Sequence, residues 1–260
     1  MAPIFFDQEA DAMATPATQL APRFRVSLAA NADDVLEAQQ LRYRIFAEEM
    51  GAQIDGGPLR IDADSFDAYC DHLIVRDDSG RMVACTRLLT GERAADAGEF
   101  YSEHEFVIDG IKRLEGRQLE VGRTCVDAAY RNGSTIATLW SGLADYVADN
   151  RIDYLFGCAS IGLDDEDEAL RIMQTIDERY LTAPDLRVES RKSFPRRAVD
   201  SEGRCRMPPL VKAYVSLGAR SCGEAFWDEE FHCVDVFMLL NIKELHPRYR
   251  RRFLGPRLGG

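Results

Sequence analysis

Short apolar runs recur between residues 24 and 240, and they predict β-strands. The first run is residues 24–29 (FRVSLA). In residues 72–89, two apolar runs flank Asp78-Ser79-Gly80, which is a composition typical of a β-hairpin turn. Four more strands are predicted at residues 118–126, 153–161, 219–227 and 231–240.

Apolar residues at helical spacing predict helices between these strands. Asp33 is expected to cap a helix whose apolar positions continue to Phe46, and Ser134 or Thr135 to cap one that runs to Val147. The remaining segments predict a helix at 164–180 with an acidic first turn, a proline-initiated helix at 208–219, a short helix at 99–106 and a long polar loop at 184–206.

The order of these elements predicts a fold of the α/β (α+β) class, with three layers around a mixed, mainly antiparallel sheet. Residues 1–22 lack periodicity, so we expect a flexible N-terminal arm, followed by one domain at 23–246 and a basic C-terminal tail at 247–260. The sequence contains neither an apolar run of about 18 residues nor a signal-peptide pattern, which favours a cytoplasmic protein.

Charge is distributed unevenly along the chain. The net charge is −12, yet residues 187–260 hold fifteen Lys and Arg against nine Asp and Glu. A strongly acidic body argues against nucleic acid as a partner, whereas the local cations could meet an acidic protein or an anionic lipid surface. A solvated charged face is the alternative. The cations concerned include Arg196, Arg197, Arg250 and Arg251.

The cysteines and histidines give no sign of a metal site. The seven cysteines include no CxxC pair, and the four histidines show no HxxxH or HExxH spacing. The stretch around Ser160 (GCASIG) has Cys158 where a nucleophile elbow needs glycine, so a hydrolase serine is not favoured. Cys158 has no basic neighbour in sequence, which indicates an inert buried thiol.

The segment from residue 119 to 147 is where chemistry is expected. A strand there leads through a Gly/Ser turn into a helix, and free N–H groups at a helix N-terminus suit a phosphate. Glu120 and Arg123 precede this turn. An amine that attacks a thioester needs a base, because it is mostly ammonium at neutral pH, and Glu120 is the candidate. A Glu120–Arg123 ion pair within the sheet is the alternative.

Several longer segments resemble a known family. LRYRIFAEEMG, the Asp64-x-x-Asp67 pair, VACTRLL, GEFYSEHEF and LEVGRTCVDAAYRNG resemble acyl-carrier-protein-dependent acyltransferases related to acyl-homoserine-lactone synthases, a branch of the Gcn5-related N-acetyltransferase fold. LWSGLADY, YLFGCASI, MPPLVKAYVSLGA and FWDEEFHCVDVFMLL are similar to the bacterial L-ornithine N-alpha-acyltransferase family. The resemblance covers roughly residues 24–250.

This resemblance implies direct transfer of a 3-hydroxy fatty acyl group from the phosphopantetheine of acyl carrier protein to the α-amine of L-ornithine, giving lyso-ornithine lipid. No permanently bound cofactor is implied. Ser134 and Ile136 replace the two glycines of the usual pyrophosphate turn, which favours a carrier protein over coenzyme A as donor. Alternatives are glutamine as acceptor, or a non-catalytic module that binds an acyl carrier or lipid. A homoserine-lactone synthase is disfavoured because GAQID lacks an expected tryptophan.

The resemblance also assigns residues. The matching active-site positions are Arg42, Phe46, Asp64, Asp67, Arg87, Glu120 and Arg123. Arg87 and Arg123 are expected to order the pocket, and the aspartates to receive the amines of the substrate. The thioester and pantetheine arm is expected to contact Thr124, Cys125, Arg131, Gly133, Ser134 and Ser160. Separately, the basic charge of the C-terminal quarter predicts docking of the carrier or of the inner membrane at Arg196, Arg197, Arg250 and Arg251.

Overall fold

The computed structural model describes residues 24–131, 133–200, 203 and 205–245. The predicted arm at 1–22 and basic tail at 247–260 lie outside these residues, and so do Arg250 and Arg251. None of the helices within the described ranges has the length and apolar character needed to cross a bilayer.

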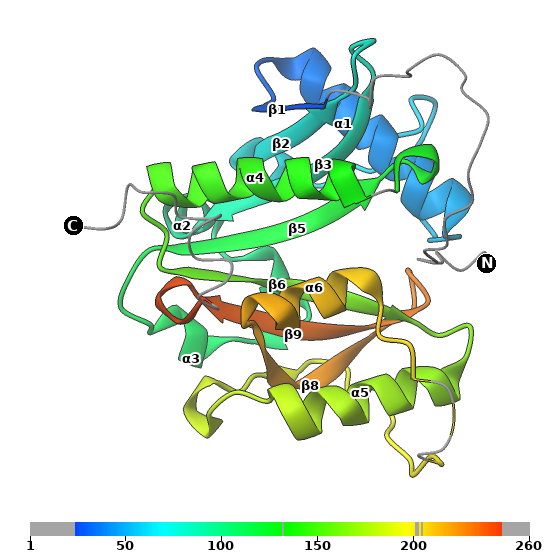
Figure 1. Ribbon diagram of the computed structural model, residues 1–260, viewed down its shortest axis with the longest axis vertical. Coiled ribbons are helices and arrows are strands. Elements are labelled where there is room, and N and C mark those ends of the chain that lie inside the picture. The colour runs from blue at the N-terminus through cyan, green and yellow to red at the C-terminus, as the bar shows by residue number, and fades with distance from the viewer. Residues whose placement is uncertain (1–23, 132, 201–202, 204, 246–260) are drawn as a thin grey trace, which may run out of the picture.

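One seven-stranded sheet runs through the described chain (Figure 1). Every neighbouring pair is antiparallel except β5 and β6, which are parallel, so the predicted mixed and mainly antiparallel sheet is confirmed. The strands, in spatial order, are β1 (Arg25–Leu28), β2 (Asp71–Arg76), β3 (Met82–Thr90), β5 (Gln118–Val126), β6 (Tyr154–Gly162), β9 (Cys233–Asn241) and β8 (Arg220–Asp228). A separate two-stranded sheet pairs β4 (Phe106–Val107) with β7 (Glu189–Ser190).

Helices cover both faces of the sheet and bury its apolar side chains. One face packs against α4 (Gly133–Asp149), α5 (Glu166–Tyr180) and α6 (Pro209–Leu217); α4 and α6 lie in front of the strands in Figure 1. The other face packs against α1 (Ala32–Tyr43), α2 (Gly91–Ala97), α3 (Asp109–Lys112) and two 3₁₀ turns, η2 (Ser65–Tyr69) and η3 (Tyr101–His104). The remaining turns are η1 (Arg44–Glu49), η4 (Ala128–Tyr130), η5 (Pro184–Leu186) and η6 (Ile242–Glu244).

The predicted helices exist, but two of the predicted caps are wrong. Asn31 caps α1, since its side chain accepts the Asp34 N–H at 3.0 Å, and Asp33 lies in the first turn. α4 begins at Gly133, which places Ser134 and Thr135 inside the helix. The polar loop at 184–206 also contains η5 and β7, and α2 was not predicted, because its seven residues are too short to show a clear period.

The centre of the sheet separates between β5 and β6. These strands pair only where Gln118–Glu120 lie beside Tyr154–Phe156; beyond that point β5 stays with β3, and β6 stays with β9. Figure 1 shows the two strands running apart. At the last contact, a Cβ on Gly157 would lie 2.2 Å from the Val121 carbonyl oxygen, so glycine is required there. Parallel strands that diverge leave unpaired backbone groups in the middle of the molecule.

Candidate active site

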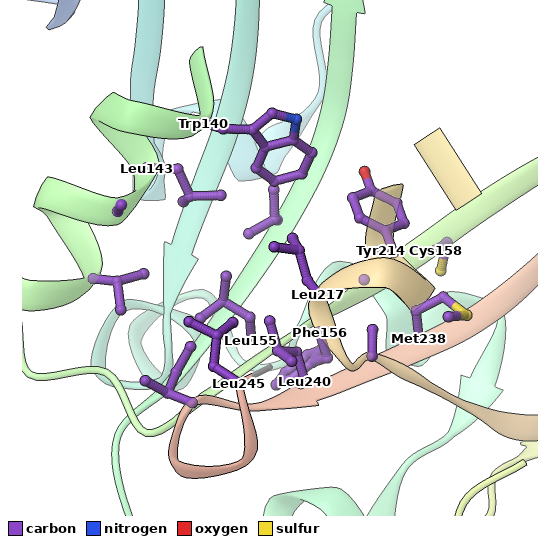
Figure 2. Close-up of a pocket in the computed structure, with 16 residues that line it drawn as sticks. Trp140, Leu143, Leu155, Phe156, Cys158, Tyr214, Leu217, Met238, Leu240 and Leu245 are labelled. Carbon is purple, nitrogen blue, oxygen red and sulfur yellow. The ribbon is translucent and has the colours of Figure 1, made fainter. Parts of the chain in front are cut away.

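An apolar cavity opens onto this gap between β5 and β6. The cavity has a volume of about 70 Å³. Trp140 of α4 and Tyr214 of α6 lie edge to face across it, with ring centroids 5.5 Å apart (Figure 2). The other lining residues are Val121, Leu143, Ala144, Val147, Leu155, Phe156, Gly157, Cys158, Leu217, Ala219, Met238, Leu240, Ile242 and Leu245. A cavity with this lining suits a hydrocarbon chain.

Glu120 occupies the last position of β5 that pairs with β6, and its side chain lies on the opposite face of the sheet from the cavity. Its carboxylate accepts the backbone N–H of Tyr101 at 2.7 Å and of Ser102 at 2.8 Å, which fixes it at the start of η3. Burial raises the pKa of Glu120, while these hydrogen bonds and the charge of Arg87 lower it. The described contacts of Glu120 include no ion pair with Arg123. The alternative of a Glu120–Arg123 ion pair within the sheet therefore does not fit the structure.

Arg42 is the most buried cation near the gap, with an exposed fraction of 1%. Its guanidinium donates to both oxygens of Asp67 at 2.8 Å, and its Nε lies 3.0 Å from Asp62 Oδ2. Arg42 lowers the pKa of Asp67 strongly, against the desolvation that would raise it. Such a bidentate pair is directional as well as strong.

Arg87 connects the two aspartates that the sequence singled out. Its NH1 donates to Asp64 Oδ1 at 2.6 Å and to Asp67 Oδ1 at 3.1 Å. The same aspartates form the capping box of η2, in which Asp64 accepts the Phe66 N–H and Asp67 accepts the Asp64 N–H. Asp67 therefore has its oxygens engaged, and direct binding of a substrate amine by Asp67 is not supported.

Arg123 sits in a β-bulge at the edge of the gap. Two residues of β5, Arg123 and Thr124, oppose Thr86 alone on β3, and Arg123 has a φ of +50°. A positive φ in a residue other than glycine is costly and is found at functional sites. The bulge directs the guanidinium to Asp62 Oδ2 at 3.2 Å and to the Tyr101 hydroxyl at 3.2 Å.

Aromatic rings pack around Arg123 from distant parts of the chain. The guanidinium carbon lies 4.8 Å from the centroid of Tyr101 and 5.2 Å from that of Phe231. Phe231 in turn contacts Phe46 edge to face at 5.8 Å. Phe46 lies on η1, a π-helical turn of a kind often found at functional sites. The structure thus brings together all seven positions that the resemblance assigned.

The residues predicted to contact the pantetheine arm do not all lie at the gap. The hydroxyl of Thr124 lies 2.7 Å from that of Thr86 beside the gap, and Gly133 and Ser134 are exposed at the start of α4. Arg131 is not free, because it forms an ion pair with Glu49. Ser160 is exposed and donates to Asp235 Oδ1 at 2.6 Å.

Cys125 does not lie at the gap, contrary to prediction. Its side chain is 5% exposed and packs with α1, and its sulfur lies 3.5 Å from that of Cys85. The bulge at Arg123 changes the alternation of β5, so that Cys125 faces the core.

The predicted docking arginines are also engaged within the chain. Arg196 pairs with Asp177, and Arg197 pairs with Glu166 and Asp167 at the start of α5. These contacts hold the chain around Arg196 and Arg197 against α5, and both arginines remain partly exposed.

Sequence reasoning missed four polar residues of the site. Asp62 joins Arg42 to Arg123, Tyr101 packs on Arg123, and Glu105 and Asp235 are buried acids nearby. Asp235 could have been found from the sequence, because it is a single acid within the apolar run of residues 233–240, where a buried polar residue is unusual. Nothing comparable marked Asp62 or Tyr101 among their polar neighbours.

The fold has counterparts among known proteins. A family model described as an acetyltransferase (GNAT) domain matches residues 41–141. The solved structure of the acyl-homoserine-lactone synthase LasI aligns over 90% of this chain and 96% of its own, with a TM-score of 0.52 and 14% identity. That of BjaI, a coenzyme-A-dependent acyl-homoserine-lactone synthase, covers 90% and 91% with a TM-score of 0.53 and 14% identity. These matches show that the fold is GNAT-like.

Relatives with closer sequences narrow this class. An L-ornithine N(alpha)-acyltransferase of Rhodobacter capsulatus is 34% identical over 87% of this chain and 93% of its own length. One from Brucella abortus is 37% identical over 86% of each chain. The chain belongs to the L-ornithine N(alpha)-acyltransferase family, as the resemblance predicted.

Proposed function

We propose that this protein transfers a 3-hydroxy fatty acyl group from the thioester of acyl carrier protein to the α-amine of L-ornithine, giving lyso-ornithine lipid. The observation that carries the proposal is the gap between β5 and β6, which has an apolar cavity on one face and buried charges with Glu120 on the other. Such a boundary can hold a fatty acyl chain on its apolar side and a charged amino acid on its polar side. The names of the relatives supply the choice of ornithine.

In the proposed reaction, the free α-amine of ornithine attacks the thioester carbonyl in the gap. A C–N bond forms and the C–S bond breaks, while Glu120 takes the proton that the amine loses, directly or through a water molecule. That proton then leaves with the carrier thiolate as the thiol. Unpaired N–H groups of the diverging strands are suited to stabilise the oxyanion. Burial supports Glu120 in this role, because it brings the pKa of the carboxyl closer to neutral pH.

We further propose that Arg42, Asp62, Asp64, Asp67 and Arg87 position the site and do not bind the amines. Their charges are balanced against one another and against Arg123. Arg123 is the cation closest to the gap, and its contacts with Tyr101 and Phe231 hold it there. A carrier protein is favoured as donor, since Arg131 is paired with Glu49 and the α4 turn lacks the usual glycines.

The proposal is tested with purified protein, 3-hydroxyacyl carrier protein and a panel of amino acids that includes ornithine and glutamine. Holo-carrier should be released only when ornithine is present, and mass spectrometry should detect N-α-acyl-ornithine. Equal release without an amine would refute the transferase proposal, and acyl-glutamine as main product would change the acceptor. Tight carrier binding without any product would favour the non-catalytic module.

A further inference from the structure

The buried acids near Arg123 form two groups that differ in their charge balance. The first group, which we call the arginine cluster, contains the acids Asp62, Asp64 and Asp67 together with three arginines, Arg42, Arg87 and Arg123. Each acid of this cluster lies within ion-pair distance of at least one arginine. It therefore has no negative charge to offer a substrate amine.

The second group, the acid pair, consists of Glu105 and Asp235. Their exposed fractions are 5% and 4%, and neither forms an ion pair with Lys or Arg among the described residues. Glu105 Oε2 has no hydrogen-bond partner there. Burial and the charge of Asp235 raise the pKa of Glu105, and burial raises that of Asp235 to about 6. Burying an acid without a neighbouring cation is unfavourable. A cation that the protein itself does not supply would therefore stabilise the acid pair.

The acid pair faces the same gap as Glu120. Burial and then the charge of Glu105 raise the pKa of the thiol of Cys158, a β6 residue that also lines the cavity, so Glu105 lies near this part of β6. Two residues further along β6, the Ser160 hydroxyl donates a hydrogen bond to Asp235 at 2.6 Å. Ser160 is exposed, so the acid pair lies close to solvent on this side. Arg123 acts electrostatically on Asp235, so the pair lies next to the arginine cluster as well.

The turn η3 connects Glu120 with the acid pair. Glu120 is held by the N–H groups of Tyr101 and Ser102 at the start of η3, and Glu105 directly follows the last residue of η3. The charge of Glu120 acts on Glu105, so the two carboxyls lie in the same buried region. A diamino acid with one amine at Glu120 therefore has a second amine to place at the acid pair.

We propose that Glu105 and Asp235, together with the Ser160 hydroxyl, bind the side-chain ammonium of the acceptor amino acid and thereby select a diamino acid. This inference rests on the proposed function and adds the residues that determine its acceptor. The ammonium supplies the missing positive charge, which leaves the α-amine as the group nearer Glu120.

A metal ion is the competing occupant. Ligand atoms of Asp228, Cys233 and Asp235 lie within 4.8 Å of one another. However, Asp235 Oδ1 already accepts from Ser160, and Asp228 Oδ1 accepts the Phe231 N–H at 3.0 Å. Burial also raises the pKa of Cys233, which opposes the thiolate that a metal needs. These contacts favour a hydrogen-bonding cation over a metal.

The experiment compares ornithine with norvaline, which has the same carbon chain without the side-chain amine. Wild type should prefer ornithine by about 10²-fold or more in kcat/KM, because loss of a charged partner leaves buried groups unpaired. Glu105→Gln and Asp235→Asn should lower kcat/KM for ornithine by about tenfold or more and reduce the preference for ornithine over norvaline by a similar factor. Glu178→Gln, an exposed acid on α5, is the matched control and should behave as wild type.

Each outcome decides the question. Equal use of ornithine and norvaline by wild type, or an unchanged preference in both variants, overturns the inference while the acyltransferase proposal stands. A stoichiometric divalent metal in the purified protein that is lost in Asp235→Asn also overturns it. Thermal melting checks the fold, and the midpoint should not fall, because each variant removes an unpaired charge. If wild type acylates no amine, the proposed function fails, and calorimetry with free ornithine then decides the inference by whether binding occurs.

Discussion

At the scale of single residues, the surroundings of Glu120 determine its orientation and its pKa. Two backbone N–H groups hold its carboxylate in place, and burial raises its pKa. A glutamate with these contacts is fixed in one orientation and buried. The same contacts stabilise η3, so the residue has a structural role in addition to the proposed catalytic one.

This environment predicts a pH dependence. Glu120 must be ionised to accept a proton, and a raised pKa moves the acidic limb of the kcat/KM profile upward from the ordinary range of glutamate, about 4.3. Glu120→Gln should lower kcat by about 10²-fold to 10⁴-fold and remove this limb. A wild-type limb at the ordinary value, or one retained in Glu120→Gln, would remove Glu120 from the role of base.

At the scale of elements, the divergence of β5 and β6 depends on one close backbone contact. A methyl group at Gly157 would meet the Val121 carbonyl oxygen at 2.2 Å, and neither backbone can move without disturbing its paired neighbour. Gly157→Ala should therefore destabilise the fold by about 1–3 kcal/mol and lower acyl transfer. Gly162→Ala on the same strand meets nothing within 4 Å and is the control for urea unfolding. Equal stabilities of the two variants would contradict the role of this contact.

The cavity between α4 and α6 makes a second prediction at this scale. Ala144 lines it and is 5% exposed, so Ala144→Phe should occupy space meant for the acyl chain. The ratio of kcat/KM for a long against a short acyl donor should fall about tenfold or more, as expected when a few methylenes are excluded. Ser141→Phe, on the exposed side of α4, should leave the ratio unchanged. If both variants behave alike, the acyl chain binds elsewhere.

At the scale of the whole molecule, buried ionisable groups set the response to pH. Arg42 lowers the pKa of Asp67, so Asp67 stabilises the fold at neutral pH and loses this effect as the pH falls below about 4. Burial raises the pKa of Asp235 to about 6, so between about pH 4 and pH 6 the unfolded chain ionises this carboxyl while the fold keeps it protonated, and the fold loses stability as the pH rises through this interval. With respect to these two groups, the protein should be most stable near pH 4.

Urea unfolding at pH 4.5, 6 and 8 tests this expectation. Wild type should lose stability between pH 4.5 and pH 6, and Asp235→Asn should reduce that loss, because the asparagine oxygen still accepts from Ser160 without adding a charge. Arg60→Ala, which removes an exposed ion pair with Glu48, is a control that should not alter the profile. A stability that rises from pH 4.5 to pH 6 in wild type would contradict the burial of an uncompensated acid.

The sequence by itself determined the strands, the main helices and the mainly antiparallel sheet, because apolar periodicity depends on local geometry that the residues carry with them. It also determined the family, since the resemblance extended over most of the chain. The same resemblance identified the seven assigned positions. It did not predict their roles, because the charge of Asp67, for example, is balanced by Arg42 and Arg87, which are distant in sequence.

Only the tertiary structure decided which acids remain unpaired and where the sheet separates. The bulge at Arg123 turned Cys125 into the core, and the capping box engaged Asp64 and Asp67. Glu105 and Asp235 come from segments 130 residues apart in sequence, and although Asp235 interrupts an apolar run, nothing in either segment indicates that the two acids meet. Burial without a cation is a property of a position in space, and no local pattern encodes it.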